Sequence, residues 1–369
     1  MAPRIDGEVR AIETGPASLL EAAPRLPAEA EEVKKASALS TTLNLTTAAL
    51  GSGILSLPWT AAGASIVTAV TLTGLALVLN TWTSLILVEA AEKYQVFDLG
   101  SLLAKLPGRL GFASQAINNA FIFVSQFMAL VGFCIIVASS VRSVFEVNRV
   151  ALLSVFALVA LPLSFASMRI LAFSSSLTIA VNLYIFAYMG YLSLTSPHFE
   201  DPGSELCVLG FTRGAVSMIS AIIMGTILQV YVLPMYEELE DRSVPKFRRI
   251  LVTSFTFIFI LYVGFMMLAL LAFGRGVHSN VLNSMPKTSA ADVARFSICP
   301  CMLGVYAINM KPMVAMIHGR RRMLIATPCI VVGSVLVAFF VTNLGVMNVL
   351  NGALSLGAFV TIGPALVGL

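Results

Sequence analysis

The sequence predicts an all-α, polytopic membrane protein with about ten transmembrane helices. Three observations support this: 58% of the 369 residues are hydrophobic, only 11% are charged, and the mean hydropathy is +0.91. In soluble proteins about a quarter of the residues are charged. The charges are also unevenly placed, since twelve of the Asp, Glu, Lys and Arg side chains lie within residues 1–35. The rest of the chain could not face water without exposing large apolar patches.

Long stretches without charge define the expected helices in order. A helix needs roughly 20 apolar residues to cross a bilayer. Charge-free runs include 36–88, 110–141, 170–199, 214–236, 250–274 and 323–369. The first and last of them are long enough for two helices each. The ten expected spans are Thr41–Ala62, Ser65–Ala91, Ala116–Phe145, Val150–Ser167, Ile170–Ser196, Gly214–Glu237, Ile250–Phe273, Ala294–Ile317, Met323–Thr342 and Val346–Val367.

The eighth span is the least apolar, because it contains Pro300, Asn309, Lys311 and Pro312. Its polar atoms are expected to face the bundle interior or to reach toward an interface. Near the ends of the second and sixth spans, Glu89 and Glu237 are expected to form interfacial ion pairs rather than a proton path.

Residues 1–38 are predicted to form a disordered cytoplasmic tail, and residues 39–369 a transmembrane domain. The tail is highly charged and poor in large apolar side chains, so it has little surface to bury. It also lacks the apolar segment behind a basic start that marks a signal peptide. With ten crossings and a cytoplasmic N-terminus, 17 Lys and Arg fall on the inner side and 6 on the outer side. This distribution follows the positive-inside rule. The plasma membrane and a vacuolar or lysosomal membrane are both compatible with the sequence.

Composition and motifs argue against several other classes of protein. The net charge of +4 is dispersed and forms no basic stripe of the kind that binds nucleic acid. The five cysteines show neither a disulfide framework nor metal-ligand spacing, so no metal site is expected. The run 100–111 lacks the Gly-Lys-Ser/Thr end of a phosphate loop, and no Ser, His and Asp set is arranged for hydrolysis. Neither an enzyme nor an ATP-driven pump is expected.

The first span contains a segment that is expected to leave helical geometry. Gly51, Gly53 and Pro58 follow one another closely, and glycine and proline are unfavourable inside a helix. Irregular backbone at membrane depth occurs only where it is buried in protein or lines a cavity. Exposed amides there can bind a carboxylate, and exposed carbonyls can bind a cation or an ammonium group. The alternative is a close helix crossing through small residues, and the glycines alone do not decide between the two.

The sixth span carries a comparable irregularity, and both irregular stretches end in Leu-Pro. Interrupted helices at positions one and six of ten are what an inverted five-plus-five repeat predicts, with the substrate site between them. The two repeats are expected over about 40–197 and 213–369. This symmetry favours a transport site over a simple crossing. The candidate substrate-binding residues are Gly51, Ser52, Gly53 and Ile54 in the first break, and Met224, Gly225, Thr226 and Gln229 in the second.

These residues resemble the amino acid/auxin permease family, and within it the sodium-coupled neutral amino acid transporters. The resemblance covers residues 40–369 and rests on the order and spacing of its pieces. The pieces are Asn44-Leu45-Thr46 leading into Gly51–Leu55, Leu163-Ser164-Phe165 with Met168–Leu171, Val232–Leu239, and Ala272–Gly274 with Val277 and Leu282. The resemblance implies a LeuT-like fold and secondary transport of amino acids, with the unwound parts of helices one and six gripping the amino acid backbone.

The chain departs from the family pattern where that pattern concerns ion coupling. The family's sodium-linked motif in helix one resembles N-L-S-N-A-I, and its second Asn falls here on Thr47, the candidate ion-coupling residue. In the family, hydroxyl side chains of helix eight are the partners of this motif. They would fall here in the stretch 299–303, which contains no Ser or Thr. A hard cation prefers oxygen ligands, so proton coupling or facilitated diffusion is at least as well supported as sodium coupling. Gln229 replaces a His that is frequent in the family, and the family's usual eleventh helix would follow Leu369.

The sequence therefore predicts a secondary active or facilitative transporter that moves small, neutral amino acids by alternating access. It is expected to work as a monomer among membrane lipids, with no cofactor besides a coupling ion, either sodium or a proton. The alternative from another class is a non-transporting amino acid sensor, which would bind the same ligand in the same breaks and signal through its tail.

Overall fold

The computed structural model describes residues 35–166, 168–195, 208–211, 214–315, 317 and 319–368. The chain divides between Lys35 and Ala36 into two units, and the described helices belong to the second, Ala36–Leu369. The tail predicted over residues 1–38 lies outside the described residues up to position 34.

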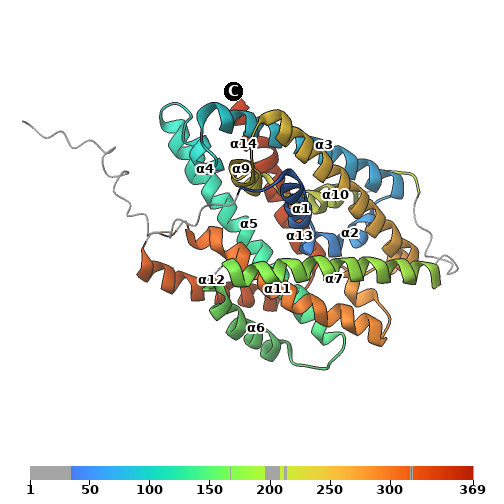
Figure 1. Ribbon diagram of the computed structural model, residues 1–369. Coiled ribbons are helices and arrows are strands. Elements are labelled where there is room, and N and C mark those ends of the chain that lie inside the picture. The colour runs from blue at the N-terminus through green and yellow to red at the C-terminus, as the bar shows by residue number, and fades with distance from the viewer. Residues whose placement is uncertain are drawn as a thin grey trace, which may run out of the picture. The chain divides into compact units, whose positions relative to one another are not determined.

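The described chain is helical almost throughout (Figure 1). Every one of the ten expected spans has a helical counterpart. In order, the helices are α1 (Ala38–Ala49), α2 (Ser52–Gly63), α3 (Ile66–Tyr94), α4 (Leu99–Leu103), α5 (Arg109–Arg142), α6 (Arg149–Ser164), α7 (Met168–Thr195), α8 (Gly214–Gly225), α9 (Gln229–Glu237), α10 (Val244–Phe273), α11 (Ser289–Ala315), α12 (Arg320–Phe340), α13 (Leu344–Ser355) and α14 (Gly363–Gly368). A π-helical segment, Leu356–Ile362, joins α13 to α14.

Eight helical stretches of the described chain are long and apolar enough to cross a membrane. Helix α6 is shorter, with 16 residues, and the first span is divided into α1 and α2, which have 12 residues each. The sixth span is divided in the same way into α8 and α9. The chain is thus a multi-pass membrane protein in which the first and sixth spans are the ones broken into half-helices near their middle.

Polar residues fix where several helices begin. The side chains of Ser65, Asp98 and Asn343 accept hydrogen bonds from the backbone N–H groups of Thr68, Ser101 and Val346, three residues further on. The first N–H groups of a helix have no partner within the helix, so a polar cap stabilises the start at that residue.

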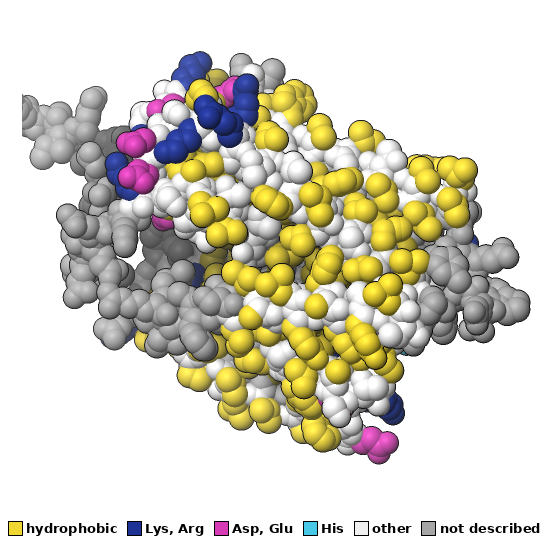
Figure 2. Space-filling view, turned by 45° about the vertical axis from the view of Figure 1, so that its right-hand side comes forward, with side chains coloured by type: hydrophobic (Ala, Val, Ile, Leu, Met, Phe, Trp, Pro, Cys, Tyr) yellow, Lys and Arg dark blue, Asp and Glu magenta, His cyan; other side chains and the backbone are white. Residues whose placement is uncertain are grey.

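The lateral surface is apolar in the way that lipid requires. Figure 2 shows hydrophobic side chains over the middle of one face, with charged side chains gathered toward its two ends. Phe112, Leu158 and Phe340 are all more than 70% exposed, which would be costly in water. The Glu89 carboxylate lies 3.5 Å from the guanidinium of Arg248 on α10, an ion pair of the interfacial kind expected from the sequence.

The half-helices α2 and α8 approach each other through glycine. A Cβ atom on Gly53 would lie 2.6 Å from the Cα atom of Gly225, and one on Gly214 would overlap the backbone of Gly63. On another side of α8, a Cβ on Gly352 of α13 would overlap the carbonyl group of Ser220. These three helices therefore pack backbone against backbone, which only residues without a side chain allow.

A loop between α10 and α11 contacts α2. The loop contains two short 3₁₀ turns, Gly274–Gly276 and Val281–Ser284. Arg295, one of the six basic residues assigned to the outer side, belongs to α11 and is only 2% exposed. Its guanidinium donates to the carbonyl oxygens of Leu282, Met285 and Pro286 and pairs with Asp292 at 2.8 Å. These acceptors replace water, so the charge can lie inside the protein.

At the opposite end of the domain, the chain before α1 pairs with the chain after α9. Ala36 donates its N–H to the carbonyl of Glu238 at 2.8 Å and accepts from the N–H of Glu240 at 3.0 Å. Ala36 and Leu239 thereby form an isolated parallel β-bridge. The start of α1 is therefore attached to the end of α9 by two backbone hydrogen bonds.

Candidate functional site

A cavity of about 320 Å³ lies where the two broken helices meet. Residues from α1, α2, α5, α7, α8, α9, α11, α13 and the π-helical segment line it, together with both breaks. From the breaks the cavity extends along α1 to Asn44 and along α9 to Met235. It therefore lies on the side where α1 begins and α9 ends, while α2 and α8 pack closely on the other side.

The first break is short. Helix α1 ends at Ala49, α2 begins at Ser52, and Leu50 and Gly51 lie between them. Gly51 precedes α2 without a side-chain cap, and a Cβ atom there would meet open space. The first turn of α2, with its partial positive charge, therefore starts beside the cavity.

The second break comprises Thr226, Ile227 and Leu228. Leu228 donates its N–H to the carbonyl of Thr226 at 2.8 Å, a tight turn that replaces helical bonding. The C-terminal end of α8, with its partial negative charge, thus faces the same cavity as the N-terminal end of α2. Both breaks are shorter than the sequence suggested, since Pro58 and Pro234 lie inside α2 and α9.

One tyrosine connects the two breaks. The hydroxyl of Tyr262, on α10, lies 2.6 Å from the carbonyl oxygen of Ala49 and 2.7 Å from that of Gly225. Each carbonyl belongs to the last residue of a half-helix, so neither has the usual partner further along its helix. The amide of Asn182, on α7, donates to the neighbouring carbonyl of Leu50 at 3.2 Å.

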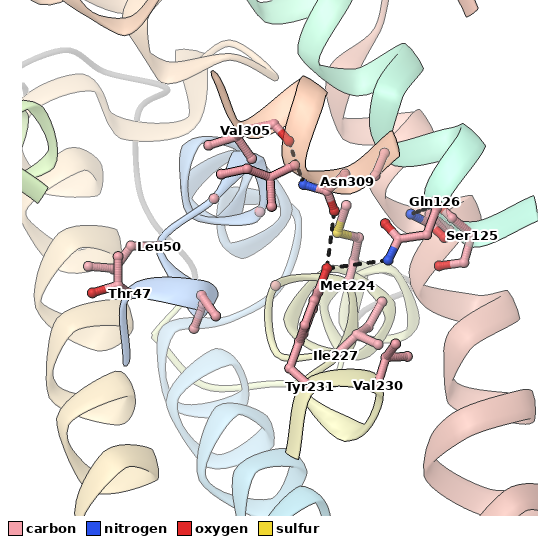
Figure 3. A pocket seen from close by; sticks show the side chains of 18 of the residues that line it. Thr47, Leu50, Ser125, Gln126, Met224, Ile227, Val230, Tyr231, Val305 and Asn309 are labelled. Carbon is pink, nitrogen blue, oxygen red and sulfur yellow. Dashed lines mark hydrogen bonds between the residues drawn. The ribbon is translucent and has the colours of Figure 1, made fainter. Parts of the chain in front are cut away.

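A second polar group lines the cavity (Figure 3). The Gln126 amide of α5 donates to the hydroxyl of Tyr231 at 3.3 Å, and that hydroxyl donates to Asn309 Oδ1 of α11 at 3.2 Å. Figure 3 shows these three side chains across the cavity from Thr47 and Leu50. They place uncharged donors and acceptors on the wall that faces the first break.

The lining of the cavity is uncharged. Among the described residues that form it, none is Asp, Glu, Lys, Arg or His. Besides Gln126, Tyr231 and Asn309, the polar lining consists of Asn44, Thr47, Ser125, Thr178 and Asn351. The two helix ends therefore provide the strongest fixed electrostatic features at this site.

A third polar group lies behind the second break. Gln229 Nε2 donates to Asn80 Oδ1 on α3 at 2.6 Å, and Asn80 Nδ2 donates to the hydroxyl of Thr226 at 3.0 Å. All three side chains are fully buried. The Gln229 Oε1 atom has no hydrogen-bond partner among the described residues. This group ties the second break to α3.

The residues proposed from the sequence are distributed over these features. Gly51, Gly53, Met224, Gly225 and Thr47 line the cavity. Three others do not: Ile54 is buried in the packing of α2, and Thr226 and Gln229 face Asn80. The backbone of Ser52 begins α2, and its side chain lies outside the description. The hydroxyl of Thr47 donates to the Leu43 carbonyl within α1 at 2.7 Å.

Sequence reasoning missed several cavity residues. Asn309 and Gln126 are polar residues in apolar spans, which indicates an inward orientation but not the cavity itself. No sequence signal distinguishes Tyr231 or Tyr262 from tyrosines at an interface. Their roles depend on which face of α9 and α10 turns inward, and this is set by tertiary packing.

The profile of the transmembrane amino acid transporter protein family matches residues 34–369. The structure resembles a manganese transporter of Eremococcus coleocola, solved with an aromatic bis-isothiourea substituted compound. Its TM-score is 0.53 at 15% identity, over 90% of this chain and 78% of that one. It also resembles a Na⁺-coupled sialic acid symporter in a substrate-bound outward-open state, with a TM-score of 0.46 at 7% identity, over 86% of this chain and 80% of that one.

No curated protein matches the sequence. At 15% identity the manganese transporter supports the fold alone, and that fold is LeuT-like, as the family resemblance implied. The family profile covers nearly the whole chain, from just before α1 to its last residue. The protein therefore belongs to the transmembrane amino acid transporter family.

Proposed function

We propose that this transporter moves small, neutral amino acids across its membrane by alternating access, and that it binds them in the cavity between the two broken helices. The observation that carries the proposal is the meeting of two opposite helix ends at one uncharged cavity. A free amino acid is a zwitterion, so a positive and a negative helix end are complementary to its backbone.

The substrate carboxylate would contact the amides at the start of α2, near Ser52 and Gly53. N–H groups at a helix N-terminus have no partner in the helix and form a general anion site. The ammonium group would contact carbonyl groups between Met224 and Thr226, where α8 ends. Gly51 supports this assignment, because it leaves open space between the cavity and the first turn of α2.

The uncharged lining supports selection of neutral side chains. A charged substrate side chain would lose its hydration without meeting an opposite charge, and such burial is costly. The cavity volume of about 320 Å³ is near the lower end of the range of ~300–1,000 Å³ for small-molecule sites, which favours small substrates.

The packing around the cavity supports alternating access. On the α2 and α8 side, the two half-helices are in backbone contact, and the loop between α10 and α11 packs against α2. On the other side, the cavity continues between α1 and α9. With the N-terminus in the cytoplasm, as the 17 to 6 distribution of basic residues favours, this arrangement is the inward-facing member of the cycle.

A counterflow assay with purified protein in liposomes tests the function. Pairs of amino acids with matched shape separate charge from size, for example glutamine against glutamate and asparagine against aspartate. We expect the neutral member of each pair to exchange at least about tenfold faster, since one uncompensated charge costs more than 1.4 kcal/mol. Equal exchange within the pairs would contradict the assigned cavity. Binding without accumulation or exchange for any amino acid would instead identify a sensor.

A further inference from the structure

The hydroxyl group of Tyr262 lies between the C-terminal ends of two half-helices, in the middle of the domain. It is 2.6 Å from the last carbonyl of α1 and 2.7 Å from the last carbonyl of α8. The side chain is only 1% exposed. A helix C-terminus carries about half a negative charge, so the two ends together favour a positive group between them. In transporters with discontinuous helices, such carbonyl ends are the usual ligands of a coupling cation.

The position of this hydroxyl is fixed by its neighbours. A Cβ atom on Gly225 would lie 2.5 Å from the phenolic oxygen, so the bond requires glycine at this position. The same glycine is in contact with Gly53 of α2. Tyr262 therefore occupies a space that both breaks define.

A metal ion and the phenol cannot both occupy this point in the observed arrangement. An ion bound to the carbonyls of Ala49 and Gly225 would need the volume that the phenolic oxygen fills, because that oxygen is already within 2.7 Å of both. The phenol hydroxyl has one proton, which carries the positive end of the O–H dipole. The carbonyl oxygens of Ala49 and Gly225 share this proton as acceptors.

A carbonyl of the first break and one in the last turn of α8 also receive hydrogen bonds from neutral protein groups. The Leu50 carbonyl accepts from the Asn182 amide at 3.2 Å, and the Ile222 carbonyl accepts from the Thr226 hydroxyl at 2.8 Å. The carbonyl oxygens of Ala49, Leu50 and Gly225, the three that flank the two breaks most closely around Tyr262, thus already accept hydrogen bonds from protein groups.

We propose that the Tyr262 hydroxyl takes the place of a coupling cation at the joint of the two broken helices, so that the transport cycle needs no sodium ion there. The proposal rests on the proposed function, since it concerns how the same cavity is coupled to ion gradients. Tyr262 is a positioning residue in this account: it holds the ends of α1 and α8 together and does not contact the substrate.

The first experiment uses the wild-type protein in liposomes. Amino acid counterflow is measured in sodium, potassium and choline chloride at one pH, and radioactive ²²Na⁺ entry is measured in the same vesicles. We expect equal exchange rates in the three salts and no entry of ²²Na⁺ with the amino acid. A tenfold loss in choline, or stoichiometric ²²Na⁺ entry, would overturn the inference and leave the proposed function intact. If no amino acid exchanges in any salt, the proposed function fails.

The second experiment assigns the effect to this hydroxyl. Tyr262→Phe leaves two carbonyls without their donor and leaves room for an ion smaller than the lost oxygen. We expect exchange in choline to fall about tenfold or more, and sodium to restore part of it. The matched control is Tyr306→Phe, because Tyr306 is equally buried and its hydroxyl bonds Ser334, away from the cavity lining. It should keep its rate within about twofold, independent of sodium.

The cation dependence separates the proposed role from simple loss of folding. A Tyr262→Phe variant that exchanges at the wild-type rate in choline would show that the hydroxyl is dispensable. Equal, reduced rates in sodium and choline would show that it does not stand in for a cation. If Tyr262→Phe yields no folded protein, as judged by gel filtration and thermal unfolding, the wild-type ion measurements decide alone.

Discussion

Replacing Gly53 by alanine is expected to abolish transport. The added methyl carbon would lie 2.6 Å from the Cα atom of Gly225 and 3.1 Å from its nitrogen. Both contacts are with backbone, so no side chain can move aside, and the two breaks must separate. Overpacking of this kind typically costs about 1–3 kcal/mol, and separation of the breaks would also displace both helix ends from the substrate. We expect the initial rate of uptake to fall to background.

The matched control is Gly63→Ala, at the other end of the same helix. A Cβ atom on Gly63 would lie 3.8 Å from the Cα atom of Gly214, which is an ordinary contact distance. The two variants are compared for surface expression, for uptake and for substrate binding in detergent. Gly53→Ala protein with wild-type affinity would show that the joint of the two breaks does not form the binding site.

Replacing Asn80 by leucine is expected to destabilise the second break, although the Asn80 side chain does not line the cavity. The substitution removes the partner of the Gln229 amide at 2.6 Å and the donor to the Thr226 hydroxyl at 3.0 Å. A buried polar group left without a partner costs about 1–3 kcal/mol. We expect a clearly lower Tm of the purified protein and a several-fold loss of uptake.

The double variant Asn80→Leu with Gln229→Leu tests whether these two residues form a structural link. Replacing both partners by apolar groups is far less costly than replacing one, so the double variant should recover most of the lost Tm. Its KM should stay near the wild-type value, because neither side chain lines the cavity. A large rise in KM on Gln229→Leu alone would return Gln229 to the substrate site. A Tm loss equal to the sum of the single variants would exclude the link.

The spans were predictable because lipid restricts a crossing segment to a helix of known length. The positions of the breaks were also predictable, since Gly51 and Gly225 mark the points where α2 begins and α8 ends. The extent of the breaks was not, because Pro58 is accommodated inside α2, where it is buried in packed protein, and Pro234, although exposed, also lies inside a helix, α9. A proline penalty measured in isolated helices overestimates the unwinding of a buried one.

The contact partners of individual side chains could not be predicted from the sequence, for a different reason. Gln229 was expected in the cavity, yet it faces α3, and a rotation of α9 by part of a turn would reverse this. Arg295 was assigned only to the outer side of the membrane, and its partners, three carbonyls of one loop that surround its guanidinium, were not foreseen. Such contacts depend on how neighbouring elements are rotated and placed, and hydropathy contains no information about either.

The β-bridge at Ala36 has a mechanical consequence for the movement of α1. The first half-helix is held at one end by the Tyr262 hydroxyl and at the other by two bonds to the strand-like segment after α9. If α1 rotates about the Tyr262 hydroxyl, the β-bridge at its N-terminal end would move the C-terminal end of α9 with it. Both bonds of this bridge are between backbone groups, so most side-chain substitutions at Ala36 leave the coupling intact. Proline at this position has no N–H to donate to Glu238 and would weaken it.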